Sequence, residues 1–261
     1  MAETKEVLAL AVELGDNMLR SGAEIYRVED TIMLIMKAFE VENFDVYVLS
    51  NGIFASADEN KEDSSSVIRH VPLSAVDLAK ISGYNQIARD LCTGKCTLDE
   101  ARTRMNEVTS SKGYPLWLQT LCCGIGSGAF AYLFGGNLLD AGLAVIIGAL
   151  EQLLLAAMGK GHLSKFIQIV FASVYVCIAG IMFKNFIPGI MVDKVMIGSI
   201  MPLVPGIAFT TAIRDFYHED HLSGTIHLLN ALLIALCIAV GICVPMFIYN
   251  MMFGTIGGGL M

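Results

Sequence analysis

The sequence has little charge, little histidine and none of the common nucleotide or hydrolase motifs. Only 16% of its 261 residues are charged, against roughly 25% in an average soluble domain, while 55% are hydrophobic. The formal net charge of −8 argues against a nucleic-acid partner, because phosphate binding needs clustered lysines and arginines. No G-x-S-x-G, P-loop or dinucleotide fingerprint is present, so we expect no cofactor, no ATP-driven pump and no enzyme.

A signal peptide, a disulfide framework and a metal motif are also missing. The first apolar run, Val7–Val12, is too short for a signal peptide. The seven cysteines are scattered, mostly in apolar runs, where cysteine acts as a small hydrophobe. The spacing of Cys92 and Cys96 is not a zinc spacing. His218 and His221 fall one residue short of the H-E-x-x-H pattern, so we expect a solvated loop there and no metal.

The charge that is present lies mostly in the first part of the chain. Residues 1–115 hold 19 acidic and 12 basic side chains, whereas residues 116–261 hold 6 and 5. This split predicts a water-compatible domain over residues 1–113 and a transmembrane domain over residues 114–261.

The first domain combines helical and strand patterns. Apolar spacing of 3.6 residues predicts helices that end near residues 20, 40, 91 and 108. Capping boxes at Ser21, at Ser74 with Asp77, and at Thr97 mark helix starts. Runs rich in β-branched and aromatic residues predict strands over 44–50, 53–57 and 65–71, with a turn at Asn51-Gly52 and a charged loop over 58–63. We therefore expect a small cytosolic α+β domain with a meander sheet.

Five apolar runs in the second domain are each close to the ~20 residues that cross a bilayer. They are Leu116–Phe134, Leu139–Met158, Phe166–Phe186, Val195–Ile213 and Ile226–Tyr249. The predicted fold is therefore an α-helical membrane protein, a five-span helix bundle preceded by the α+β domain.

Loop lysines and arginines predict the orientation of this bundle. Lys112, Lys160, Lys165 and Arg214 fall on one side, and Lys184 and Lys194 fall on the other. This places the first domain in the cytosol and the C-terminus outside the cell membrane. Because five spans cannot form two equal halves, we expect the other half to come from a second copy or a second polypeptide.

One buried acid and one broken span are the candidate transport elements. Glu151 is the one ionisable residue in the middle of a span, and such residues usually face a pathway or a partner. The alternative is a structural hydrogen bond. Pro202, Pro205 and Gly206 interrupt the fourth span, which favours a broken helix that offers backbone groups to a pathway. Further candidates follow the break: hydroxyls at Thr210 and Thr211, and an interfacial anchor or gate at Arg214 and Asp215.

Two acids of the first domain flank an apolar helix face. Glu24 and Glu29 fall on opposite edges of the apolar stripe of the second helix, while Arg27 points away from it. A carboxylate at such an edge is partly buried and needs a partner.

Two separated stretches resemble the signatures of the threonine/serine exporter family. Residues 22–29, Gly-Ala-Glu-Ile-Tyr-Arg-Val-Glu, resemble its G-x-x-x-x-R-V-E signature, which carries Arg27 and Glu29. Residues 202–206, Pro-Leu-Val-Pro-Gly, with Arg214-Asp215 and Ser223-Gly224, resemble its second signature. The resemblance implies a split form of the family, in which a second short membrane subunit supplies the other half. Split members resemble a two-component exporter of a dicarboxylate such as succinate, so the substrate is either threonine and serine or a dicarboxylate.

The sequence therefore predicts a subunit of a secondary exporter of small polar metabolites, driven by an ion or proton gradient. The alternative from another class is a membrane-associated hydrolase that uses Glu24, Glu29 and His70 as acid and base groups. A third interpretation is an assembly or sensor subunit that does not transport. Whether the chain also forms a homo-oligomer stays open.

Overall fold

The computed structural model describes residues 4–60, 63–72, 76–111, 113–161 and 163–253. Its contacts divide the chain into two compact units. Unit 1 consists of residues 1–112 together with 211–226, and unit 2 consists of residues 113–210 and 227–261. A short stretch from late in the chain thus folds with the N-terminal residues.

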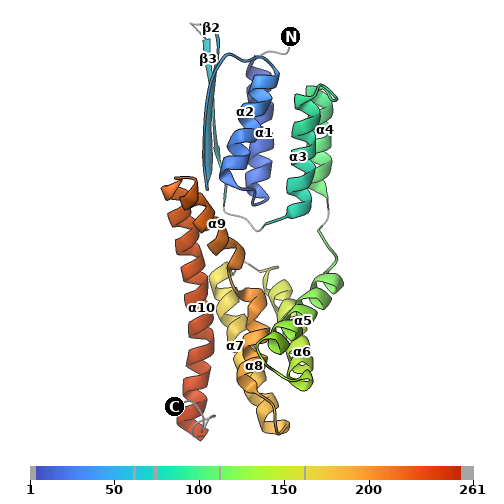
Figure 1. The fold of residues 1–261 in the computed structure, drawn as a ribbon, viewed down its shortest axis with the longest axis vertical. Coiled ribbons are helices and arrows are strands. Elements are labelled where there is room, and N and C mark those ends of the chain that lie inside the picture. The colour runs from blue at the N-terminus through green and yellow to red at the C-terminus, as the bar shows by residue number, and fades with distance from the viewer. Residues whose placement is uncertain (1–3, 61–62, 73–75, 112, 162, 254–261) are drawn as a thin grey trace. The chain divides into compact units, whose positions relative to one another are not determined.

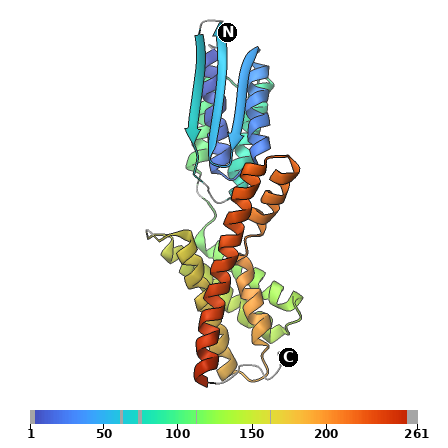
Figure 2. The same cartoon turned by 90° about the vertical axis from the view of Figure 1, so that its left-hand side faces the viewer.

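Unit 1 is a three-stranded antiparallel sheet packed on helices (Figure 1). Its elements before the late stretch are α1 (Thr4–Arg20), α2 (Ile25–Ala38), β1 (Asn43–Leu49), β2 (Gly52–Asn60), β3 (Asp63–His70), α3 (Leu78–Cys92) and α4 (Leu98–Ser110). The strands lie side by side in the order β1-β2-β3, with α1 and α2 behind them (Figure 2). Burial explains this layering, since one face of each helix supplies a shared core that includes Leu8, Leu14, Ile32 and Ile53.

β2 and β3 are longer than the sequence pattern predicts. β2 continues to Asn60 and β3 begins at Asp63, so most of the expected loop over 58–63 belongs to the sheet. The hairpin turn also differs by one residue: Ser50 and Asn51 form it, and Gly52 already pairs with Leu49.

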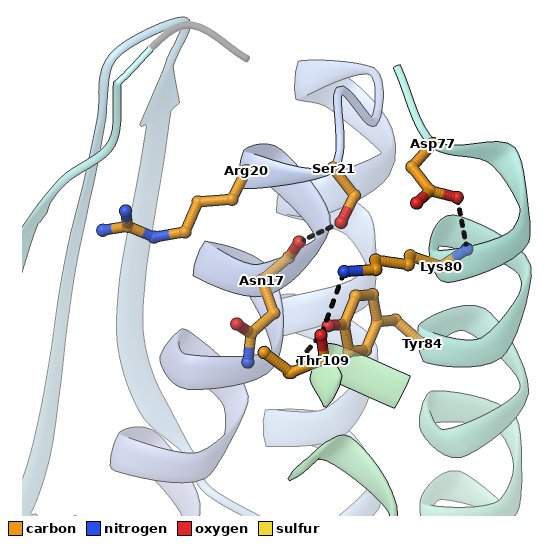
Figure 3. Close-up of a pocket in the computed structure, with 7 residues that line it drawn as sticks. All are labelled: Asn17, Arg20, Ser21, Asp77, Lys80, Tyr84 and Thr109. Carbon is orange, nitrogen blue, oxygen red and sulfur yellow. Dashed lines mark hydrogen bonds between the residues drawn. The ribbon is translucent and has the colours of Figure 1, made fainter. Parts of the chain in front are cut away.

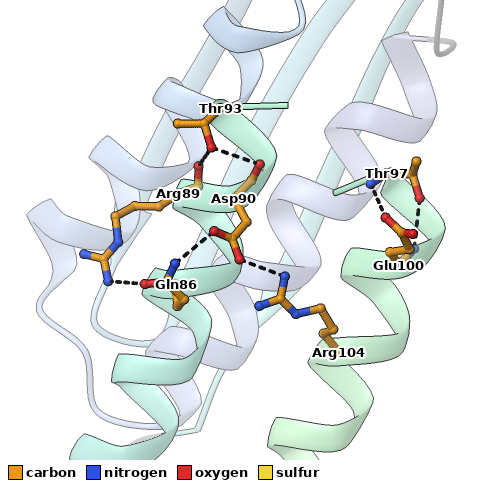
Figure 4. A network of polar contacts seen from close by, with 7 residues as sticks. All are labelled: Gln86, Arg89, Asp90, Thr93, Thr97, Glu100 and Arg104. Atoms are coloured by element: carbon orange, nitrogen blue, oxygen red, sulfur yellow. Dashed lines mark hydrogen bonds and ion pairs between the residues drawn. The ribbon is translucent and has the colours of Figure 1, made fainter. Parts of the chain in front are cut away.

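One predicted capping box is confirmed, and a second helix start has a different cap. Thr97 Oγ1 accepts from the Glu100 amide at 3.3 Å, and the Glu100 carboxylate accepts from the Thr97 amide at 2.8 Å, as the box requires (Figure 4). Asp77, predicted as the second member of a box that Ser74 begins, is itself the cap of α3 and accepts from the Lys80 amide at 3.1 Å, while Ser74 lies outside the described residues. The capping box predicted at Ser21 is wrong. Ser21 sits past the end of α1 and its hydroxyl donates to the Asn17 carbonyl at 2.8 Å, because the last carbonyls of a helix have no partner within it.

A polar network joins α3 to α4. Asp90 accepts from Arg104 at 2.8 Å and from Gln86 at 2.9 Å (Figure 4). The hydrogen bond from Arg104 lowers the pKa of Asp90. This network fixes the helical pair that backs the core of unit 1.

The remaining helices are apolar. They are α5 (Leu116–Leu133), α6 (Leu138–Met158), α7 (Lys165–Phe186), α8 (Val192–Ile200), the 3-10 turn η1 (Met201–Leu203), α9 (Gly206–Tyr217) and α10 (His221–Phe253). Within the described residues, α5, α6, α7 and α10 are long and apolar enough to cross a membrane, and α8–η1 with α9 makes a fifth span if the bent pair counts as one.

The predicted fourth span, Val195–Ile213, is not one straight helix. Its two halves meet at an angle of 56°. The break falls at Pro202 and Pro205, as the sequence predicts, because proline cannot donate to the helical ladder. The fifth predicted span also starts earlier than expected, at His221.

Small residues bring α5, α6 and α8 close together in unit 2. A methyl group on Gly128 of α5 would lie 2.8 Å from the Ala141 carbonyl oxygen of α6, and one on Gly198 of α8 would lie 2.6 Å from the Ser127 carbonyl oxygen of α5. Gly148 of α6 likewise contacts the Ser127 side chain. Such contacts are the usual means by which membrane helices pack without a hydrophobic driving force.

Candidate functional site

Residues of the two signature stretches lie together in unit 1. Glu24, the residue before α2, forms ion pairs with Arg27 at 3.3 Å and with Arg214 near the end of α9. The Glu24 side chain is 23% exposed and that of Arg214 40%. The carboxylate at the edge of the apolar stripe therefore finds the partner that its position demands, and it finds it far along the chain.

Two further contacts fix the late stretch within unit 1. The ring of Tyr26 stacks on the imidazole of His218, with centroids 4.4 Å apart and planes 21° from parallel. The backbone N–H of Ser50, in the hairpin turn, donates to the hydroxyl of Ser223 at 3.2 Å. An ion pair, a ring stack and a hydrogen bond thus bind residues 214–223 to α2 and to the sheet.

A cavity of about 510 Å³ lies where these elements meet. Its lining is Ile25, Tyr26, Glu29, Asp30, Tyr47, Val48, Asp215, His218, Glu219, Asp220, His221 and Leu222. Five of these side chains are carboxylates, and none is a lysine or an arginine. The cavity, which we call the acidic cavity, is therefore suited to a small ligand with a positively charged group and unsuited to a dianion.

Glu29 is the acid of the first signature that lines the acidic cavity. Partial burial raises its pKa, a hydrogen bond from the Val48 backbone opposes that shift, and the nearby charges of Asp30 and Asp220 raise it further. The raised pKa means that Glu29 holds its proton more tightly than a free glutamate side chain does.

The other predicted residues of unit 1 lie in different places relative to the acidic cavity. Asp215 lines the acidic cavity and is 97% buried, with 3% of its surface exposed. Arg27 is exposed and acts through its ion pair with Glu24. His70 ends β3 and is not among the cavity-lining residues, so the structure does not join it with Glu24 and Glu29 as a hydrolase would require.

A second cavity, of about 260 Å³, lies between α1, α3 and α4 (Figure 3). Its polar groups already bond to one another: Lys80 Nζ donates to the Thr109 carbonyl at 3.0 Å, and the Tyr84 hydroxyl lies 2.9 Å from that of Thr109. Because these groups are satisfied internally, this cavity offers less to a ligand than the acidic cavity does.

Unit 2 places Glu151 in its interior. The side chain is fully buried, and neither carboxylate oxygen accepts a hydrogen bond from any described residue. Three hydroxyl oxygens are likewise buried and have no hydrogen-bond partner among the described residues: those of Thr120, Ser127 and Ser199. The sequence pattern singled out only Glu151, because serine and threonine within an apolar run resemble ordinary small residues of helix packing.

The broken span leaves its predicted residues in different surroundings. Pro202 and Gly206 are exposed at the break. The Thr210 hydroxyl is used within its own helix, since it donates to the carbonyls of Gly206 at 3.1 Å and Ile207 at 3.0 Å. Thr211 begins the stretch that folds with unit 1.

These features define a class: a multi-pass helical membrane protein that carries a small α+β unit. Residues 9–249 match the model of the family described as "Putative threonine/serine exporter", and the chain belongs to that family. The hydrolase alternative receives no support from this match.

Two curated relatives extend the comparison. The chain is 24% identical over 249 residues to the "Probable threonine/serine exporter" of Mycobacterium tuberculosis, an alignment that covers 93% of this chain and 46% of the relative. It is 25% identical over 131 residues to "Pheromone-regulated membrane protein 10" of Yarrowia lipolytica, which covers 49% of this chain and 11% of that relative. The chain therefore spans less than half the length of either relative. No solved structure matches it.

Proposed function

We propose that this chain is a component of a secondary exporter that moves small hydroxy amino acids, threonine and serine, out of the cytosol across the cell membrane. Family membership supports export, and the name of the M. tuberculosis relative supports this pair of substrates. An ion or proton gradient supplies the energy in this proposal.

The observation that carries the choice of substrate is the charge of the acidic cavity. At a separation of 4 Å, two like charges repel by about 4 kcal/mol in surroundings of intermediate polarity. A dicarboxylate such as succinate would meet this repulsion from several of the five lining acids. An amino acid brings an ammonium group that pairs with them, and its carboxylate and hydroxyl can face His218, His221 or the Tyr26 hydroxyl. The acidic cavity thus favours threonine and serine over succinate.

The acidic cavity is, in this proposal, the place where unit 1 receives substrate on the cytosolic side. The distribution of loop lysines and arginines supports that orientation. The ion pair of Glu24 with Arg214 holds the second signature against α2 and keeps the cavity formed. α9 runs unbroken from Gly206 to Tyr217, so one helix connects the cavity-lining Asp215 to the break at Pro205.

Transport also needs a membrane acid and further membrane helices. Glu151 serves as the carrier of a proton or of a polar substrate group. A second short membrane subunit completes the pathway, as the split arrangement of the family implies.

Efflux from cells that lack their own exporters tests the proposal. The chain is expressed with and without a candidate membrane partner, and external threonine, serine and succinate are measured. We expect threonine and serine efflux when both are present. Glu29→Gln should reduce this efflux, while Glu107→Gln, which removes an exposed acid of α4, should leave it unchanged. Efflux of succinate alone, or efflux by the partner without this chain, would contradict the proposal.

A further inference from the structure

Unsatisfied polar atoms are concentrated in the interior of unit 2. Among the described residues, seven buried side-chain oxygen atoms have no hydrogen-bond partner, and five of them belong to Thr120, Ser127, Glu151 and Ser199. Buried polar groups are normally paired, and an orphaned carboxylate in a membrane segment is especially costly. Such a group therefore calls for a functional explanation.

The pairing of α5 with α6 places two of the hydroxyls beside Glu151. Ser127 packs against Gly148, and the Gln152 amide donates to the Gln119 side chain at 3.2 Å. These contacts show two antiparallel helices in register. Glu151 follows Gly148 by nearly one turn on the buried side of α6, so it faces α5 at a level between Ser127 and Thr120.

α8 supplies the fourth oxygen. Its Gly198 approaches Ser127 so closely that an added methyl would lie 2.6 Å from the Ser127 carbonyl oxygen. Ser199, the next residue, is fully buried. α5, α6 and α8 thus each bring oxygen atoms without hydrogen-bond partners into the interior of unit 2, and we call these four residues together the oxygen track.

The oxygen track holds one acidic group, Glu151, and no described residue forms an ion pair with it. No described lysine, arginine or histidine forms an ion pair with Glu151, whereas Lys194 pairs with Asp193 at 3.2 Å. A carboxylate and three hydroxyls offer oxygen atoms alone, which suits an ammonium group or a hard monovalent metal ion.

We propose that Glu151, with the hydroxyls of the oxygen track that lie nearest to it, forms a binding site for a small monovalent cation inside the membrane bundle. The inference rests on the proposed function and names the group that Glu151 carries. The cation is either the ammonium group of the exported amino acid or Na⁺ acting as the coupling ion. Both bind through the same chemistry: Glu151 supplies the charge and the hydroxyls accept from, or coordinate, the ligand.

Thermal unfolding of the purified full chain in detergent tests this site. The single tryptophan, Trp117, lies in the first turn of α5 and reports on that helix. The probes are L-threonine, the analogue with a hydroxyl in place of its ammonium group, and NaCl compared with choline chloride. A ligand that binds only the folded chain raises the unfolding midpoint. Stabilisation by threonine but not by the analogue identifies the ammonium group, and stabilisation by NaCl over choline chloride identifies Na⁺.

Matched variants locate the binding. Glu151→Gln keeps the side-chain shape and should weaken the apparent affinity about tenfold or more, because a hydrogen bond to a charged group is lost. Ser127→Ala keeps the helix packing and should weaken it about threefold to tenfold. Glu107→Gln, which alters an exposed acid of unit 1, should have no effect. Ser127→Ala keeps the test decisive if Glu151→Gln fails to fold.

Failure of this inference can be told apart from failure of the proposed function. If threonine binding is lost in Glu29→Gln but intact in Glu151→Gln and Ser127→Ala, the oxygen track is not the site and the acidic cavity remains. If neither threonine nor Na⁺ stabilises the wild-type chain while threonine efflux proceeds, Glu151 carries only a proton, and the cation site is overturned.

Discussion

The ion pair between Glu24 and Arg214 should hold residues 211–226 to the rest of unit 1. Arg214→Gln would remove it. Exposed ion pairs contribute about 0.2–1 kcal/mol, and breaking a fully buried pair costs about 3–5 kcal/mol. With side chains 23% and 40% exposed, this pair belongs near the lower range, so we expect a loss of about 1 kcal/mol after solvent screening. That corresponds to roughly fivefold more frequent opening of the segment.

Hydrogen exchange of the full chain in detergent measures this opening, because exchange rates of protected amides follow the local opening equilibrium. Peptides covering 211–226 should exchange about fivefold faster in Arg214→Gln. Glu24→Gln should accelerate exchange less, because the Arg214 side chain, which is 40% exposed, can then be solvated by water. The double variant should resemble Arg214→Gln, because the two changes remove one interaction.

A matched control lies in the same unit. Arg102→Gln breaks the pair with Glu13, whose charged atoms are 3.8 Å apart and well exposed, and it should leave exchange of 211–226 unaltered. If the effects of Arg214→Gln and Glu24→Gln simply add, or if Arg102→Gln accelerates exchange equally, the ion pair does not hold this segment.

Three further changes test other parts of the structure. Because burial raises the pKa of Glu29 above 4.5, the folded chain holds this proton more tightly than the unfolded chain. The free energy of unfolding should therefore fall as pH rises from 4.5 through the raised value and then level off; Glu29→Gln should flatten this slope in thermal melts at several pH values. Thr97→Ala should cost about 1 kcal/mol of stability by removing the cap of α4, visible in urea unfolding. Gly128→Ala should cost about 1–3 kcal/mol because the methyl meets the Ala141 carbonyl, whereas Gly126→Ala, which meets nothing within 4 Å, should leave the detergent melting temperature unchanged.

Local signals predicted the elements of this fold well. Pro202 and Pro205 locate the break because a missing N–H acts within a single turn of helix. Thr97 and Glu100 locate a helix start for the same reason, since the capping box closes within four residues. Ser21 and Glu24 match that pattern equally well, but they do not form a capping box. The Ser21 hydroxyl donates to a carbonyl at the end of α1, and the Glu24 carboxylate forms an ion pair with Arg214. A local sequence pattern does not include residues far along the chain that compete for the same side chain.

The residues of the acidic cavity could likewise be predicted only in part from the sequence. The edge position of Glu29 on its helix predicted partial burial and a need for partners. Its neighbours Asp215 and Asp220, however, come from a stretch that the apolar pattern assigned to the end of a span and to a loop. His218, expected to be solvated, stacks on Tyr26. Only the fold brings these residues together, because no periodicity links positions so far apart in the chain.

In the proposed function, the acidic cavity selects a cationic amino group over a dicarboxylate. The most direct measurement is the ratio of threonine to succinate efflux from exporter-deficient cells that express this chain with its membrane partner. We expect efflux of threonine without succinate, and a severalfold loss of threonine efflux in Glu29→Gln at unchanged membrane expression. Succinate efflux that exceeds threonine efflux, or threonine efflux that is undiminished in Glu29→Gln, would contradict this expectation.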